Sequence, residues 1–154
     1  MSLTFHLLCG VPASGKSTYA QTLLAANPEM VYLCPDLLRE EMTGDMSDHS
    51  ADSFIWGNLI YTRIVGARTQ SKDILFDATS YRPKNRKGPC QFARKEGYRV
   101  VAHVMKTPFE VCLERNMARD RQVPREVFDR MVAGWTTPDP AKEPYIDEVG
   151  EVRP

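Results

Sequence analysis

The sequence feature that most constrains this chain is a nine-residue loop near the N-terminus, in which the pattern G-x-x-x-x-G-K-[ST] is complete. Its residues are Gly10, Val11, Pro12, Ala13, Ser14, Gly15, Lys16, Ser17 and Thr18. The glycines allow the backbone to curl until successive N–H groups point into one concavity, which binds the phosphates of a nucleotide. An apolar run at residues 3–9 precedes the loop, and a helical pattern at residues 17–26 follows it. We therefore predict a strand, a nucleotide-binding loop and a helix in succession.

Two side chains of this loop bring charge and metal chemistry. Lys16 is expected to reach the β- and γ-phosphates, and the Ser17 hydroxyl is expected to hold one coordination position of Mg²⁺. The N-terminus of the following helix adds partial positive charge at the same place. The loop thus predicts ATP or another nucleoside triphosphate as phosphoryl donor, with Mg²⁺ as cofactor and Lys16 as a catalytic residue.

The composition is that of an ordinary globular protein, and it argues against several other classes of protein. The 154 residues predict one domain over residues 1–154, with 42% hydrophobic residues, 26% charged residues and a formal net charge of zero. Zero net charge argues against non-specific nucleic-acid binding by bulk charge. No apolar run approaches the ~20 residues of a membrane span, and the N-terminus lacks a secretory signal pattern. The four cysteines are widely spaced, so we expect buried thiols and a cytoplasmic protein.

Strand and helix patterns alternate along the chain. Strands are predicted at residues 3–9, 30–34, 73–77 and 98–105, and helices at 17–26, 36–42, 53–69, 83–96, 107–119 and 124–135. A capping box is predicted at Thr107, Pro108 and Glu110, and a Pro-rich tail follows at about residues 136–154. This alternation predicts an α/β fold whose parallel sheet is covered by helices on both faces. Ligands then belong at the carboxyl ends of the strands.

Two residues just after the second strand suit an acceptor site. Asp36 and Arg39 are three residues apart, so they share one face of the predicted helix. Phosphoryl transfer to an alcohol needs a base near the attacking hydroxyl and a cation that holds the acceptor, and Asp36 and Arg39 fit these two roles. In the alternative interpretation, Asp36 only caps the helix and Arg39 is a surface residue.

Polar residues after the third strand are further candidates. Asp77 ends an apolar strand, where an acidic residue can organise Mg²⁺, and Thr79 could contact metal-bound water or the acceptor. Residues 79–99 contain seven basic residues against one acid. This basic run, which includes Arg82, either borders a site for a polyanionic substrate or forms a solvated helix face.

A pair of arginines near residues 115–124 suggests a lid over the triphosphate. Arg115 and Arg119 are four residues apart, where like charges on a helix repel each other unless an anion lies between them. Arginines in such a position neutralise charge in the transition state of phosphoryl transfer. The alternative is a pair of solvated arginines, partly compensated by Asp120.

The histidines do not form a site. His6 and His103 fall inside predicted strands, where a buried and hydrogen-bonded core histidine is expected, and His49 falls in the polar loop 45–52. Without a cluster of His and Cys, a structural zinc is not expected.

Over nearly its whole length, the chain resembles the polynucleotide 5′-hydroxyl kinases, a family of small P-loop kinases. GVPASGKSTYA is similar to the nucleotide loop of that family. VYLCPDLLREEMTGD is similar to its acceptor segment, in which an Asp is the general base and an Arg three residues later holds the acceptor phosphate. DILFDATSYRPKNRK resembles the family's third-strand segment, and TPFEVCLERNMARDRQVP resembles its lid helix with phosphate-contacting arginines.

The resemblance implies an adenylate-kinase-like sheet with strand order 2-3-1-4, an arginine-bearing lid, and Mg²⁺ with ATP as the donor. It implies catalytic roles for Asp36, Lys16 and Arg119, and nucleotide binding by Arg115 and Arg119 in addition to the loop. The residues implied in acceptor binding are Asp36, Arg39, Asp77, Thr79 and Arg82. Ser17 would bind the metal directly, and Asp77 through water.

The function implied is ATP-dependent phosphoryl transfer to the 5′-hydroxyl of a DNA or RNA end, as in nucleic-acid repair. The chain departs from the family at Cys34-Pro35, where a Ser, Asn or Arg usually precedes the base. A phosphatase or ligase domain often accompanies such a kinase, so a stand-alone enzyme and one domain of a longer chain are both expected possibilities. The same motifs occur in zeta-toxin-like and antibiotic-modifying kinases, which makes a small nucleoside, sugar or antibiotic the alternative acceptor. A nucleotide-binding regulatory module is a third interpretation.

Overall fold

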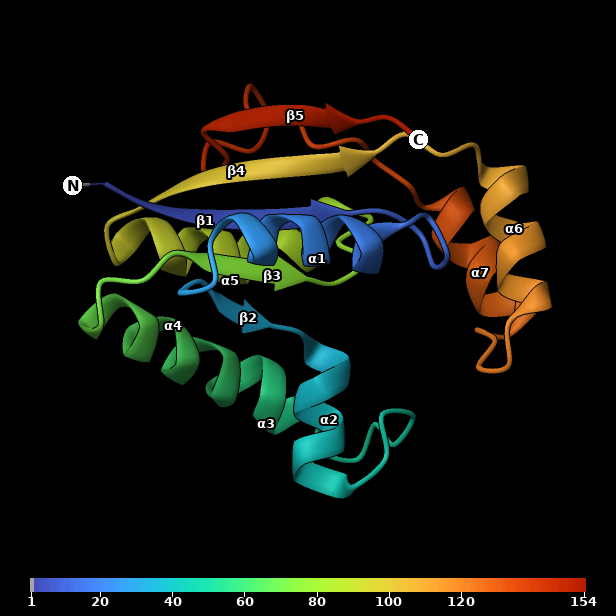
Figure 1. The fold of residues 1–154 in the computed structure, drawn as a ribbon, viewed down its shortest axis with the longest axis horizontal. Coiled ribbons are helices and arrows are strands. Elements are labelled where there is room, and N and C mark those ends of the chain that lie inside the picture. The colour runs from blue at the N-terminus through green and yellow to red at the C-terminus, as the bar shows by residue number, and fades with distance from the viewer. Residues whose placement is uncertain (1) are drawn as a thin grey trace.

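A parallel sheet of five strands forms the centre of the molecule in the computed structural model, which describes residues 2–154 (Figure 1). The strands are β1 (Leu3–Cys9), β2 (Val31–Leu33), β3 (Ile74–Asp77), β4 (Tyr98–Met105) and β5 (Glu148–Val152). Their spatial order is β2-β3-β1-β4-β5, and every neighbouring pair is parallel. The predicted α/β fold and the order 2-3-1-4 are confirmed, with a fifth strand added beside β4.

Strand β5 lies in the tail, where the sequence pattern predicts no strand. It pairs with β4 from Val101 opposite Glu148 to Met105 opposite Val152. Its sequence, EVGEV, is short and has charged residues at two of five positions, as is common for edge strands that must not recruit another chain. Because its partner lies more than forty residues earlier in the chain, the local pattern does not reveal it.

Helices cover both faces of the sheet. Their bounds are α1 (Lys16–Ala26), α2 (Pro35–Thr43), α3 (Asp52–Phe54), η1 (Ile55–Leu59), α4 (Ile60–Thr69), α5 (Pro83–Lys95), α6 (Phe109–Ala118) and α7 (Arg125–Ala133). The helix predicted over residues 53–69 is continuous through α3, η1 and α4, of which η1 is a π-helical segment. Helix α1 lies on one face and α5 on the other, while α6 and α7 lie beyond the carboxyl ends of the strands (Figure 1).

The main core lies between the sheet and the helices α4 and α5. Phe5, Leu7 and Phe76 of the sheet are fully buried there, against Ile60 and Ile64 of α4. Burying each such side chain contributes about 1.5–3 kcal/mol, so this layer holds the strand ends, and the loops that follow them, in fixed positions. Among residues 2–154, no helix combines the length and apolar character needed to cross a bilayer.

The predicted capping box at the start of α6 is wrong. Pro108 precedes the first helical residue, and no side chain caps the helix. The Thr107 hydroxyl instead donates a buried hydrogen bond to the carbonyl of Ser14, at 2.9 Å. Thr107 therefore makes a tertiary contact with the phosphate loop instead of capping α6.

Candidate active site

The phosphate loop lies tightly against its neighbours. The N–H of Gly10 donates to the carbonyl of Thr79 at 2.9 Å. A Cβ atom on Gly10 would come within 2.4 Å of Ser14 Oγ and 2.8 Å of the Met105 side chain, so a larger residue does not fit. Gly15 has φ +96°, a left-handed conformation that favours glycine. Both glycines of the motif are therefore required by the geometry.

Several features of the loop fit a bound anion. Ala13 has φ 64°, a conformation that is uncommon for residues other than glycine and often found at functional sites. Ser14 Oγ is buried and has no hydrogen-bond partner within residues 2–154. Helix α1 begins at Lys16, so its first N–H groups have no carbonyl partner inside the helix. Ser17 is exposed on that first turn, where its hydroxyl fits the role of a Mg²⁺ ligand.

Lys16 is the point at which four segments of the chain meet. Burial lowers the pKa of the Lys16 ammonium, and the neighbouring Asp77 carboxylate opposes this shift. The charges of Asp36 and Arg119 also lie close enough to act on the pKa of Lys16. The structure thus brings together the loop lysine, the end of β3, the first turn of α2 and the residue after α6.

Asp77 is held by a residue that the sequence analysis missed. It is only 6% exposed, and its Oδ2 accepts a hydrogen bond of 2.5 Å from the Tyr32 hydroxyl. Burial, together with this bond, raises the pKa of Tyr32, so the phenol stays a donor. Tyr32 belongs to β2, which pairs with β3. Only this pairing links it to Asp77, so no signal in the sequence marks it.

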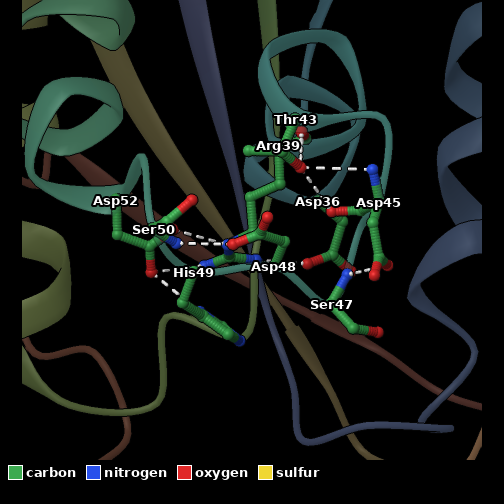
Figure 2. Close-up of polar contacts among 9 residues, drawn as sticks. All are labelled: Asp36, Arg39, Thr43, Asp45, Ser47, Asp48, His49, Ser50 and Asp52. Atoms are coloured by element: carbon green, nitrogen blue, oxygen red, sulfur yellow. Dashed lines mark hydrogen bonds and ion pairs between the residues drawn. The ribbon is translucent and has the colours of Figure 1, made fainter.

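Arg39 lies between two carboxylates (Figure 2). Its Nη1 donates to Asp36 Oδ1 at 2.6 Å, and its Nε donates to Asp52 Oδ1 at 2.8 Å. A longer bond of 3.3 Å joins Nη2 to Asp52 Oδ2. A guanidinium has five N–H donors, and these bonds use three of them. One N–H on Nη1 and one on Nη2 are therefore not used by these bonds. The Arg39 side chain is 12% exposed, so this end of the guanidinium lies in a partly desolvated position.

Asp52 is the second residue missed by the sequence analysis, which placed it only in the polar loop 45–52. His49 also contacts it, with Nδ1 2.8 Å from Asp52 Oδ2. The Arg39 hydrogen bond, the His49 contact and their charges lower the pKa of Asp52, although burial opposes them. The carboxylate therefore stays ionised and holds Arg39 on the side away from Asp36.

Asp36 has cations on both of its oxygens. Its Oδ1 pairs with Arg39, and its Oδ2 lies 3.6 Å from Nη1 of Arg121. Cys34 is the N-terminal flanking residue of α2, and no side chain caps that helix. The alternative interpretation of Asp36 as a helix cap is therefore wrong.

The two predicted lid arginines lie in different surroundings. Arg119 follows the end of α6, and its pKa is lowered by burial and by the charge of Arg121, while Asp36 opposes the shift. Arg115 lies within α6, close to Cys112: burial raises the pKa of the Cys112 thiol, and the Arg115 charge opposes this shift. The structure thus brings Arg119 and the unpredicted Arg121 to Asp36, and no ion pair among residues 2–154 involves Arg115.

The remaining predicted acceptor residues, Thr79 and Arg82, lie in the segment between β3 and α5. Thr79 contributes its backbone carbonyl to the phosphate loop, as described above. Arg82 donates from Nε to Asn85 Oδ1 at 3.0 Å, and its Cζ lies 5.0 Å from the centre of the Tyr81 ring. No contact within residues 2–154 joins Arg82 to Asp36 or Arg39.

The two strand histidines form a hydrogen-bonded row away from this site, as predicted, although they are only partly buried. His6 Nδ1 lies 2.9 Å from His103 Nε2, and the Tyr19 hydroxyl lies 3.0 Å from His103 Nδ1. Both ring nitrogens of His103 therefore have a hydrogen-bond partner, which fits a structural role.

A curated relative is the L-seryl-tRNA(Sec) kinase of Methanococcus maripaludis, which is 27% identical over 136 residues. The match covers 86% of this chain and 52% of the relative. The chain thus spans about half the length of the curated relative that it matches.

Solved structures share the fold at low sequence identity. Chaetomium thermophilum Kti12, solved with ADP-AlF3, has a TM-score of 0.72 at 14% identity, covering 97% of this chain and 88% of that one. A fungal RNA kinase has a TM-score of 0.70 at 11% identity, with coverages of 99% and 76%. A sugar kinase from Janibacter sp. HTCC2649 has a TM-score of 0.68 at 16% identity, with coverages of 97% and 85%.

The family assignment comes from the sequence itself. Residues 5–138 match the model of a family described as an AAA domain, and this match includes most of β1, the phosphate loop, the strands β2, β3 and β4, and the predicted lid residues 115–124. The parallel sheet and the loop geometry agree with a nucleotide-dependent phosphotransferase. The chain therefore belongs to the AAA domain family, within which it is a P-loop kinase.

Proposed function

We propose that this P-loop kinase transfers the γ-phosphoryl group of ATP to the 5′-hydroxyl of a DNA or RNA end. The observation that supports this proposal most directly is the pair Asp36 and Arg39, joined at 2.6 Å and close enough to Lys16 for the Asp36 charge to act on it. An acceptor base beside the phosphate-binding lysine is what transfer to an alcohol requires.

In the proposed reaction, Asp36 acts through Oδ2, because its neighbour Arg121 lies at 3.6 Å, beyond hydrogen-bond distance, and Oδ2 can accept a hydrogen bond from the acceptor hydroxyl. The hydroxyl proton passes to this oxygen as the hydroxyl oxygen bonds to the γ-phosphorus, and the bond from that phosphorus to the ADP oxygen breaks. Lys16 and Arg119 stabilise the negative charge on the transferred group. Mg²⁺ bound by Ser17 would neutralise charge on the β- and γ-phosphates.

The two free N–H groups of Arg39 support an acceptor that carries a phosphate. They lie on Nη1 and Nη2, the end of the guanidinium that can form a fork toward a phosphate. A nucleic-acid end offers such a phosphate on the 3′ side of the nucleotide whose 5′-hydroxyl reacts. The fungal RNA kinase among the structural neighbours agrees with this choice of acceptor.

A second candidate is a small neutral hydroxyl compound, such as a sugar. Asp36 and Asp52 already balance the charge of Arg39, which favours an acceptor that brings no further negative charge. The Janibacter sugar kinase shares this fold. In this case Asp52 and Arg39 would bind acceptor hydroxyl groups instead of a phosphate.

Transfer from labelled ATP to a panel of acceptors tests the proposal. The panel contains a 5′-hydroxyl oligonucleotide, a nucleoside 3′-monophosphate, the plain nucleoside, several sugars, and serine-charged tRNA, because the curated relative is named for that substrate. We expect transfer to the oligonucleotide and the nucleoside 3′-monophosphate, and much less transfer to the nucleoside, because positioning of the hydroxyl depends on the bound phosphate.

Two controls accompany this panel. Lys16→Ala should abolish transfer while circular dichroism shows an intact fold, which ties the activity to the phosphate loop. Arg39→Ala should raise the acceptor KM. It should also reduce the difference in transfer rate between the nucleoside 3′-monophosphate and the nucleoside. Equal use of all nucleoside acceptors, or transfer only to sugars or to charged tRNA, would overturn the polynucleotide proposal.

A further inference from the structure

Helix α5 presents a row of cationic side chains to solvent. Four of its exposed residues follow one helix face with the spacing i, i+3, i+7 and i+11, and they are Lys84, Lys87, Gln91 and Lys95. Arg94, next to Lys95, is exposed on the same side, and Pro83 is exposed at the start of the helix. The buried residues of the helix lie on the opposite side, and they are Arg86, Pro89, Cys90 and Ala93. We call Lys84, Lys87, Arg94 and Lys95 the basic stripe.

Most of the basic stripe has no anionic partner in the protein. Within residues 2–154, no ion pair involves Lys84, Lys87 or Lys95, whereas the exposed cations Arg99, Arg125 and Arg153 are paired with acids. Arg94 is the exception, since its Nη2 lies 3.4 Å from Asp147 Oδ1. In a chain with a net charge of zero, the exposed side of α5 thus carries three lysines without an ion pair.

The stripe begins at the edge of the sheet that carries the candidate active site. Helix α5 starts at Pro83, six residues after Asp77 at the carboxyl end of β3. Lys84 and Lys87 lie in its first turns, where the free N–H groups of the helix add positive charge. From Lys84 to Lys95, the rise of about 1.5 Å per residue gives a length of about 16 Å. A stripe of this length, which starts near the site, is long enough to contact several phosphates of one nucleic-acid strand.

Helix α4 adds to the charge at the far end of this surface. It lies beside α5, where the Tyr61 and Phe92 rings pack with centres 4.9 Å apart. Near the end of α4, Arg68 donates from Nε to the carbonyl of Glu96 at 2.8 Å. Its guanidinium therefore lies next to the last turn of α5 and continues the positive surface.

We propose that the basic stripe binds the phosphodiester backbone of a single-stranded nucleic acid whose 5′ end occupies the acceptor site. The role of the stripe in catalysis rests on the proposed function, but its binding of nucleic acid is measured separately. Lysine contacts of this kind are made to phosphates and do not distinguish sequences. The stripe would therefore supply affinity for a polymer without selecting its bases.

The test compares the unmodified chain with the double variant Lys84→Ala/Lys87→Ala. Fluorescence anisotropy measures binding of a labelled single-stranded 12-mer with a 5′-phosphate, at several salt concentrations between 50 and 200 mM. Each phosphate contact contributes about 0.7 to the slope of log K against log salt, so loss of two contacts should lower the slope by about 1.4. Affinity near 100 mM salt should fall on the order of tenfold.

Matched variants separate a site from a general effect of charge. Lys72→Ala/Arg153→Ala removes the same number of positive charges, but from residues paired with Glu29 and Glu151, and it should bind like the unmodified chain. Lys84→Arg/Lys87→Arg should keep the affinity, because it keeps the charges. Transfer to a nucleoside 3′-monophosphate should be unchanged in all variants, since this acceptor is too short to reach the stripe.

The results distinguish the stripe from the proposed function. If 5′-hydroxyl ends are phosphorylated but the alanine variant keeps the slope and affinity, the stripe proposal is wrong and the proposed function stands. If binding depends on the stripe but no nucleic acid is phosphorylated, the stripe stands and the proposed function is wrong. Equal losses in the Lys72→Ala/Arg153→Ala variant would overturn the stripe as a specific surface.

Discussion

The two carboxylate oxygens of Asp36 have different neighbours, and this difference allows its role to be tested. Oδ1 is held by Arg39 at 2.6 Å, while Oδ2 has only Arg121 at 3.6 Å. Asp36→Asn keeps the shape of the side chain but cannot accept a proton. We expect ATP binding to persist and transfer to fall by about 10²–10⁴-fold, the usual contribution of a general base.

Equilibrium binding of a fluorescent ATP analogue and single-turnover transfer from labelled ATP measure these two quantities. Glu114→Gln, on the exposed surface of α6, serves as the control for loss of one carboxylate. If Asp36→Asn transfers within about threefold of the unmodified chain, Asp36 is not the base.

Asp52 orients Arg39, and its replacement tests the role of Arg39 in binding the acceptor. Asp52 accepts hydrogen bonds from Nε and Nη2 of Arg39. Asp52→Asn should therefore weaken the orientation of Arg39, and Asp52→Ala should weaken it further. We expect the KM of the acceptor to rise several-fold in Asp52→Ala, with a smaller change in kcat and an unchanged KM for ATP. Asp48→Ala, in the same loop but bonded only to Ser50, is the matched control. An effect on ATP alone would contradict a role of Asp52 in the acceptor site.

Arg115 and Arg119 carry the same charge, but the structure places them in different surroundings, one within α6 and the other just after it. Arg119 lies near Lys16 and Asp36, whereas Arg115 lies one turn earlier, near Cys112. Arginines that contact the transferring phosphoryl group contribute about 10³–10⁵ in rate. We therefore expect Arg119→Ala to lower kcat by at least tenfold and Arg115→Ala to change it by less than threefold. Steady-state kinetics with saturating ATP measures both, and a larger effect of Arg115→Ala would reverse this assignment.

A buried ion pair joins α5 to the C-terminal segment. Arg86 is fully buried, and its Nε and Nη2 donate to the two Glu143 oxygens at 2.8 and 3.0 Å. Its Nη1 also donates to the carbonyls of Ser80 and Thr136. These bonds fix the segment between β3 and α5, which in turn contacts the phosphate loop through Thr79.

Removing one partner leaves a buried charge without compensation. We expect Arg86→Met to lower the free energy of unfolding by about 3–5 kcal/mol, and Arg86→Met/Glu143→Leu to restore part of that loss. Urea denaturation followed by circular dichroism measures both. The exposed pair Arg125 and Asp129 is the control, since breaking it should cost about 1 kcal/mol or less. Similar losses at the two pairs would show that Arg86 has no special structural role.

Stability should also depend on pH through the strand histidines. Burial, and to a lesser extent the charge of His6, lowers the pKa of His103 from 6.5 to about 4. Between these values the unfolded chain binds a proton that the folded chain does not, so the free energy of unfolding falls as the pH decreases. We expect His103→Gln to reduce this dependence between pH 6.5 and 5, measured by urea denaturation at each pH. An unchanged dependence would exclude His103 as its source.

Much of the fold could be predicted because its signals are local. The phosphate loop, the strands β1 to β4 and the helices each arise from spacing or periodicity within a few residues, and the structure agrees with these predictions. Asp36, Asp77 and Arg119 were predicted because each lies next to such an element, and the structure brings them near Lys16. Their roles in catalysis stay predictions, which the variants above test.

Local sequence patterns are therefore enough to predict the nucleotide loop, the α/β architecture and the residues at the carboxyl ends of the strands. The tertiary structure alone decided which of these residues meet, and which residues hold them. Tyr32 and Asp77 are 45 positions apart, Arg39 and Asp52 are 13 apart, and Arg86 and Glu143 are 57 apart. Such contacts depend on strand pairing and on helix packing, which place distant residues at hydrogen-bond distance. No pattern of neighbouring residues contains that information, because each partner looks like an ordinary polar side chain until the chain has folded.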